Sequence, residues 1–155
     1  MSPKFIVLGG IAFFIVANII GAVTGQLIHG PGGFLEPLYQ AHQAMWRPEL
    51  NQVPPDLAAL APLWVGMGLL NSLIVTTAYN VFAGALTGSP LANGLRFGAG
   101  ASLIMVGLYC SYFGIFALPG TVWITWAIEG VFIYTLGGIA LGYVARKFLS
   151  PVPPA

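Results

Sequence analysis

Charged residues are scarce in this chain. Of its 155 residues, 6% are charged and 57% are hydrophobic, whereas a soluble domain carries about 25% charged residues to keep its surface hydrated. This composition excludes an ordinary soluble protein. We therefore expect membrane lipids, and no nucleic acid, among its partners.

Cysteine and histidine are also nearly absent. The single Cys110 excludes an intrachain disulfide. His29 and His42 are the only imidazoles, and both lie outside the long apolar runs, whereas a haem held between membrane helices needs histidine within them. The chain also has no nucleotide-binding glycine pattern, paired-histidine metal motif or nucleophile elbow. His29 and His42 are thus the available cofactor-ligand candidates, and we expect neither a metal centre nor an enzyme.

Long apolar segments are what the chain does have. Four of them exceed the ~18 residues needed to cross a bilayer, and they cover residues 5–28, 63–86, 95–118 and 122–145. They predict an all-α integral membrane protein with one domain over residues 1–155. Because the links at 87–94 and 119–120 are short, we expect an antiparallel bundle in which the last three spans are neighbours.

Residues 29–62 form the one long connection. Within it, residues 37–46 have apolar and aromatic side chains at helical spacing, which predicts a short helix at the outer membrane interface. Asp56 is the expected N-cap of the helical stretch that leads into the second span. The other end of the chain, residues 148–155, is a proline-rich tail.

The basic residues predict an orientation. One side of the membrane carries Lys4, Arg96, Arg146 and Lys147. The other side carries Arg47 with the acids Glu36, Glu49 and Asp56. The excess of positive charge places both termini in the cytoplasm.

Glu129 is the only acid within the predicted spans. Counting about nine residues, or ~13 Å, inward from the outer end of each span reaches a polar side chain in every one. These side chains are Glu129, Asn18, Asn71 with Ser72, and Tyr109. Unpaired polar groups are costly in hydrocarbon, so we expect Glu129 to form a hydrogen bond with one of the others.

This polar layer has two interpretations. It is either a hydrogen-bonded clasp between helices or a functional site, such as a proton relay or a polar handle for a quinone, pigment or lipid. The clasp is the commoner use of such residues.

Two glycine pairs have the spacing that lets membrane helices approach closely. They are Gly21 with Gly25 and Gly138 with Gly142. The second pair lies on the face of its helix opposite Glu129, which predicts protein on both sides of the last span.

The chain resembles small bacterial four-span membrane proteins. The similarity rests on short motifs: Leu27 to Gly30, Tyr39, Trp46-Arg47-Pro48, Ala78-Tyr79 and Leu86 to Gly98. The resemblance implies a bacterial inner-membrane location and assigns no activity or catalytic residue.

Three classes of function fit these features. The first is a non-catalytic accessory subunit of a larger membrane complex of the respiratory or photosynthetic type, which packs helices and binds lipid or pigment. The second is a small, oligomeric, proton-coupled carrier or channel that uses Glu129. The third is a membrane enzyme that acts on a lipid or quinone, and it has the least support because no catalytic set is present.

Overall fold

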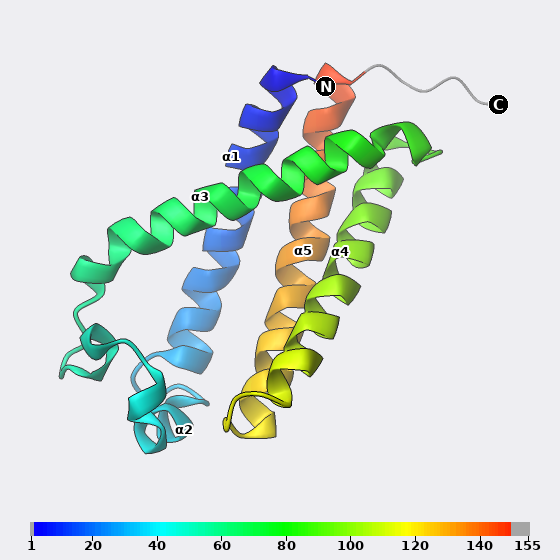
Figure 1. The fold of residues 1–155 in the computed structure, drawn as a ribbon. Coiled ribbons are helices and arrows are strands. Elements are labelled where there is room, and N and C mark those ends of the chain that lie inside the picture. Colours follow the sequence, from blue (N-terminus) through cyan, green and yellow to red (C-terminus); the bar gives the residue numbers. More distant parts are fainter. Residues whose placement is uncertain (1, 150–155) are drawn as a thin grey trace.

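A computed structural model describes residues 2–149 of the chain, and its regular structure is helical throughout (Figure 1). The long helices are α1 (Pro3–Thr24), α3 (Leu57–Phe82), α4 (Pro90–Phe113) and α5 (Gly120–Phe148). With their short extensions, these 4 helices are long and apolar enough to cross a membrane. This confirms the predicted all-helical chain with four candidate spans. The predicted tail over 148–155 lies, from residue 150 onward, outside the described residues.

Polar caps determine where three of the long helices begin. Ser2, Asp56 and Ser89 each accept a hydrogen bond from a backbone N–H in the first turn of the helix that follows, which stabilises an exposed helix start. The cap at Asp56 was predicted. The cap at Ser89, with Pro90 at the first helical position, starts α4 earlier in the chain than the predicted span of 95–118, and α4 also ends earlier, at Phe113.

The long helices form an open row instead of the predicted regular bundle. The central helix, α5, packs against α1 on one side and α4 on the other, while α3 packs against α1 (Figure 1). The predicted contact between the last two spans is therefore present, whereas span two packs on span one, which corrects the prediction that all of the last three spans are neighbours. A short link brings only the ends of two helices together and does not set their direction.

Like α5, whose span also has 29 residues, α3 is longer than a perpendicular crossing of the bilayer requires. Together with the 3-10 turn η4 (Ala83–Ala85) it forms a span of 29 residues, or about 43 Å at 1.5 Å per residue. The hydrocarbon layer is only about 30 Å thick, so a helix of this length inclines or extends beyond the membrane. In Figure 1, α3 crosses obliquely in front of α1 and α5.

The contact between α4 and α5 depends on glycine. A Cβ added to Gly138 would lie 2.5 Å from the carbonyl oxygen of Gly94 and 2.6 Å from the Cα of Gly98, and one added to Gly142 would overlap Pro90. The two backbones thus touch where they have no side chains. Gly138 and Gly142 thus pack against Gly94 and Gly98 of α4, and Gly94 belongs to the helix and not to the predicted link at 87–94.

The other predicted glycine pair has no such role. Nothing lies within 4 Å of a Cβ built on Gly21 or on Gly25, so the prediction that they form a helix contact is corrected. The α1 glycines that do pack are Gly9, against Thr76 and Leu141, and Gly10, against Leu73. These two face α3 and α5, whereas Gly21 and Gly25 face away from the neighbouring helices.

Large side chains fill the space where α1, α3 and α5 meet. Phe5, Phe13 and Leu141 are fully buried there, and Tyr79 is nearly so. The ring of Phe13 lies directly on Gly137 of α5. This core holds the end of the molecule that carries the termini (Figure 1).

The long outer connection contains short helices. They are α2 (Glu36–Ala41) and the 3-10 turns η2 (Gln43–Met45) and η3 (Pro48–Asn51). The helix predicted over 37–46 is therefore present but shorter, because His42 leaves the helical conformation. All three lie at the end of the molecule opposite the termini (Figure 1).

Candidate functional site

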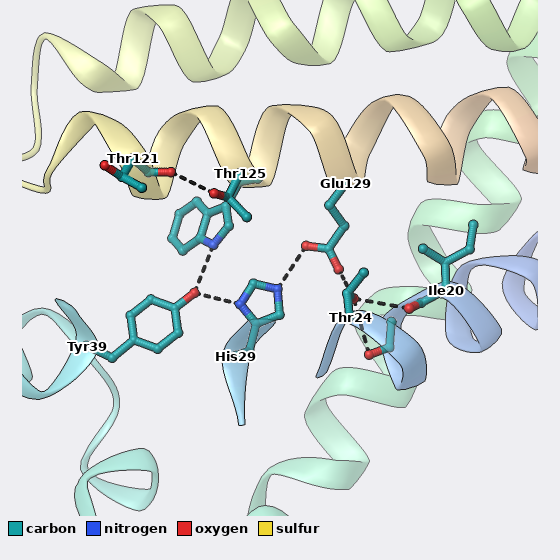
Figure 2. A network of polar contacts seen from close by, with 9 residues as sticks. Ile20, Thr24, His29, Tyr39, Thr121, Thr125 and Glu129 are labelled. Atoms are coloured by element: carbon teal, nitrogen blue, oxygen red, sulfur yellow. Dashed lines mark hydrogen bonds and ion pairs between the residues drawn. The ribbon is translucent and has the colours of Figure 1, made fainter. Parts of the chain in front are cut away.

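Glu129 lies at the centre of a polar network that joins three parts of the chain (Figure 2). Its Oε2 is 3.0 Å from Nε2 of His29, and its Oε1 contacts the hydroxyl of Thr24. Only 16% of the Glu129 side chain and 26% of the His29 side chain are exposed. A half-buried carboxyl group is tolerated here because both its oxygens have polar partners.

A π-helical turn brings His29 to this position. The last residues of α1 widen into η1 (Gly25–His29), after which Gly30 is extended. Short π segments are rare and frequently occur at functional sites. The chain then folds back on the helix end, where the N–H of Leu35 donates to the carbonyl of Ile28 at 2.8 Å. His29 is thus held between the end of α1 and the outer loop.

Tyr39 of α2 continues the network away from Glu129. Its hydroxyl is 2.7 Å from Nδ1 of His29 and 3.1 Å from Nε1 of Trp126. The Tyr39 and His29 rings are nearly parallel, with centroids 5.9 Å apart. The indole N–H of Trp46 donates to the backbone carbonyl of Tyr39 at 3.1 Å. These contacts attach the short helix of the outer loop to α5.

The donors along this network run in one direction. An indole N–H only donates, so the Tyr39 oxygen accepts the hydrogen bond from Trp126. The Tyr39 hydroxyl then donates to Nδ1 of His29, and the Nε2–H of His29 donates to Glu129. A neutral imidazole therefore satisfies every polar atom from the indole to the carboxyl group.

Thr24 allows the carboxyl group to exist in either protonation state. Its hydroxyl also lies 3.1 Å from the backbone oxygen of Ile20. If Glu129 is ionised, Thr24 donates to it. If Glu129 is protonated, it donates to Thr24, which then donates to Ile20. Glu129 keeps its contact with Thr24 in both states, and only the Thr24–Ile20 hydrogen bond is lost when the carboxyl group is ionised, because the hydroxyl has a single proton to donate.

The phenol of Tyr39 belongs to the outer loop, and its pKa is raised above the ordinary value of 10.0. The largest cause is burial, which disfavours the phenolate; the nearby charge of Glu129 also raises the pKa, while the hydrogen bond from Trp126 lowers it. Tyr39 therefore stays a neutral donor to His29 at physiological pH.

An aromatic cluster surrounds the outer end of the network. The ring of Trp126 meets those of Trp46 and Trp123 edge to face, with centroids 6.0 and 5.4 Å apart, and Tyr109 lies 6.3 Å from both Trp123 and Trp126. Such pairs stabilise by roughly 0.5–1.5 kcal/mol each beyond the area they bury. The indole N–H of Trp123 is buried without a partner among the described residues. The cluster holds the outer loop over the start of α5.

The partners that the sequence predicted for Glu129 lie elsewhere. Asn18 donates to the carbonyl of Phe14 at 2.8 Å, and Ser72 donates to that of Gly68 at 2.7 Å, so both are satisfied by their own helices. Asn71 accepts from the hydroxyl of Tyr134 at 3.5 Å. Tyr109 joins the aromatic cluster. Within residues 2–149, none of these four hydrogen-bonds Glu129, and the predicted layer is corrected on this point.

The error has a geometric cause. The layer was built by counting inward from predicted helix ends, and α4 ends at Phe113 instead of 118. The ring of Tyr109 still lies against Gly130, next to Glu129, but it packs among the rings of Trp123 and Trp126. Asn71 meets α5 at Tyr134, which lies further along that helix than Glu129. Hydroxyl and amide groups on membrane helices also readily bond to their own backbone, which needs no second helix.

His29 was predicted as a cofactor-ligand candidate, whereas Thr24, Tyr39 and Trp126 were not predicted as site residues. One signal was available, because Trp126 lies three residues before Glu129 and so on the same helix face. The other imidazole, His42, is 2.8 Å from the carbonyl of Leu38 and stays outside the network. Within the described part of the chain, no three side chains of histidine, cysteine, aspartate or glutamate lie close enough to share a metal ion.

Comparison of the chain with protein-family models, with curated proteins and with solved structures found no match.

Proposed function

We propose that this protein is a non-catalytic helical subunit of a larger complex in the bacterial inner membrane, with both termini in the cytoplasm. The observation that carries the proposal is that the carboxyl group of Glu129 is fully used within the chain. It bonds to His29 and Thr24 and thereby fastens the outer loop and α1 to α5. This is the arrangement of a structural clasp.

The distribution of apolar surface supports this role. Large side chains on α3 and α4 face outward, among them Met67, Ile74, Leu103 and Ile104, whose exposed fractions lie between 57% and 74%. Meanwhile α5 has a neighbour on each side. The outward faces of α3 and α4 are available to lipid chains or to partner helices, while the interior of the row is already packed. Lipid, quinone or pigment bound between such helices fits the same role.

A second candidate function is proton-coupled transport by a small homo-oligomer. The observation that favours it is the unbroken series of exchangeable protons from Tyr39 through His29 to Glu129, in which Glu129 keeps its hydrogen bonds in both protonation states. Ionisable groups within membrane segments often mark proton relays.

One experiment tests both candidates. The tagged full-length chain and its Glu129→Gln variant are purified in mild detergent from the membranes of their native host, and their masses and partners are measured. A stoichiometric complex with other membrane proteins, equal in yield for both, supports the accessory subunit. A homo-oligomer contradicts it. If the homo-oligomer also carries out proton uptake in vesicles and Glu129→Gln abolishes this, the carrier is supported.

A further inference from the structure

A cavity of about 530 Å³ opens at the end of the molecule opposite the Glu129 network. Its lining residues come from the ends of α3 and α5, the start of α4 and Ser2, the N-cap of α1. Its walls come from segments that only the tertiary structure brings together. It shares no residue with the network around Glu129.

The free donors in its wall are the guanidinium of Arg146 and the side-chain amide of Asn80, whereas the amide of Asn93 donates to Leu86 and Gly88 and leaves its Oδ1 as an acceptor. Arg146 of α5, Asn80 of α3 and Asn93 of α4 all line the cavity. The Oδ1 of Asn80 accepts weakly from the backbone N–H of Ser2 at 3.5 Å, and the guanidinium of Arg146 forms no ion pair with an acid among residues 2–149. Arg146 can therefore pair with an anion from outside the described chain.

The remaining wall is apolar. Ala83, Leu86, Phe148 and Leu149 contribute to it, beside the half-polar ring of Tyr79. A free anion gains no stabilising contact from such an apolar surface. A ligand that carries an anionic group next to hydrocarbon fits both parts of the wall.

The charge of this end of the molecule agrees with such a ligand. It carries Lys4, Arg96, Arg146 and Lys147, and no acid occurs in the helix ends or in the turn around them. Basic pockets between membrane helices at the cytoplasmic surface bind phosphate-bearing headgroups, because that leaflet is rich in anionic lipid. The guanidinium of arginine matches phosphate oxygens in a two-pronged geometry.

We propose that this cavity binds the headgroup of an anionic phospholipid. Arg146 pairs with the phosphate, Asn80 donates a further hydrogen bond, and the glycerol and first acyl carbons lie against Leu86 and Phe148. The site is separate from the clasp at Glu129 and does not depend on which complex the protein joins.

The test is lipid binding by the purified full-length protein in detergent, followed by native mass spectrometry. Phosphatidylglycerol and phosphatidylcholine with identical acyl chains are titrated, with and without an excess of inorganic phosphate. We expect tighter binding of phosphatidylglycerol, and a loss of about tenfold in Arg146→Gln, as one charge-assisted hydrogen bond predicts. Asn80→Leu should weaken binding by a smaller factor.

Arg96→Gln is the matched control. It removes the same charge at the same end, but Arg96 bonds to the carbonyl of Thr87 and does not line the cavity, so its affinity should change by no more than about twofold. Equal losses in Arg146→Gln and Arg96→Gln would mean a diffuse charge effect and overturn the proposal. Equal binding of the two lipids would do the same. Full competition by inorganic phosphate would assign the site to a free anion instead, which also contradicts it. Far-ultraviolet circular dichroism checks that every variant is folded.

Discussion

The Nε2 atom of His29 lies 3.0 Å from Oε2 of Glu129, although 100 positions separate the two residues in the chain. The contact forms only when α1 and α5 lie side by side and the π turn directs the imidazole toward α5. The contact therefore requires that both helices, and the outer loop between α1 and α3, are packed as in the structure.

Replacing Glu129 by leucine removes the acceptor of His29 and the partner of Thr24. We expect a loss of roughly 1–3 kcal/mol in the free energy of unfolding, because buried polar groups are left unpaired. Glu129→Gln should change it by less than about 0.5 kcal/mol, since the amide oxygen accepts from His29 and the amide nitrogen donates to Thr24. Thermal unfolding followed by tryptophan fluorescence measures both. Glu49→Gln, in the outer loop, is the control for loss of an acid. A large effect of Glu129→Gln would mean that the negative charge itself is needed.

Removing the hydroxyl of Tyr39 tests the outer half of the network. In Tyr39→Phe, Nδ1 of His29 and the N–H of Trp126 both lose their partner, and the expected cost is again about 1–3 kcal/mol. Limited proteolysis of the loop should become faster, because α2 is then less firmly attached to α5. Tyr112→Phe is the matched control, as Tyr112 is 44% exposed. Equal protease sensitivity of the two variants would show that the hydroxyl of Tyr39 does not hold the loop.

The close approach of α4 and α5 predicts a difference between glycines. Gly138→Leu or Gly142→Leu forces a side chain into the backbone of α4 and should abolish the native helix contact, because association in membranes depends on such packing. Gly21→Leu, at a site with open space, should be tolerated by the monomer. The yield of folded protein after size-exclusion chromatography distinguishes them. If Gly21→Leu alone prevents recovery of the complex, its face touches a partner.

The raised pKa of Tyr39 predicts a pH dependence. The folded phenol holds its proton more tightly than the unfolded one, so its stabilising contribution is complete below pH 10 and decreases as the pH rises through the raised folded value. The phenolate absorbance of wild type minus that of Tyr39→Phe isolates this group. We expect the difference to titrate above pH 10 in the folded protein. A midpoint at or below 10 would contradict the burial seen in the structure.

The orientation inferred from the basic residues is testable with reporters. A fusion at Ala155 should be active as a cytoplasmic reporter, and one inserted near Gln52 should behave as periplasmic. The reverse pattern would invert the topology and would place the proposed phospholipid cavity in the outer leaflet.

Much of the fold was accessible from the sequence because it depends on local properties. The four apolar runs predicted the four long helices, since only a regular helix satisfies its backbone in hydrocarbon. The N-cap at Asp56 followed from residue type alone. The start of α4 was equally local, but the glycine-rich segment around Gly94 was interpreted as a turn, when Ser89-Pro90 was the stronger signal.

The order and tilt of the helices were decided only by the tertiary structure. In a soluble helix the apolar face identifies the core. Lipid and protein interior are equally apolar, so the apolar side chains of α3 do not indicate which face packs against other helices. Asn18 bonds to its own helix, Asn71 meets Tyr134, and Tyr109 packs among aromatic rings, so none of them pairs with Glu129 as the predicted layer required. Glu129 itself was recognised as exceptional because burying a carboxyl group is costly wherever it occurs. Its partners, His29 and Thr24, were determined by the packing of α1 on α5 and by one π turn, which no pattern in the sequence marked.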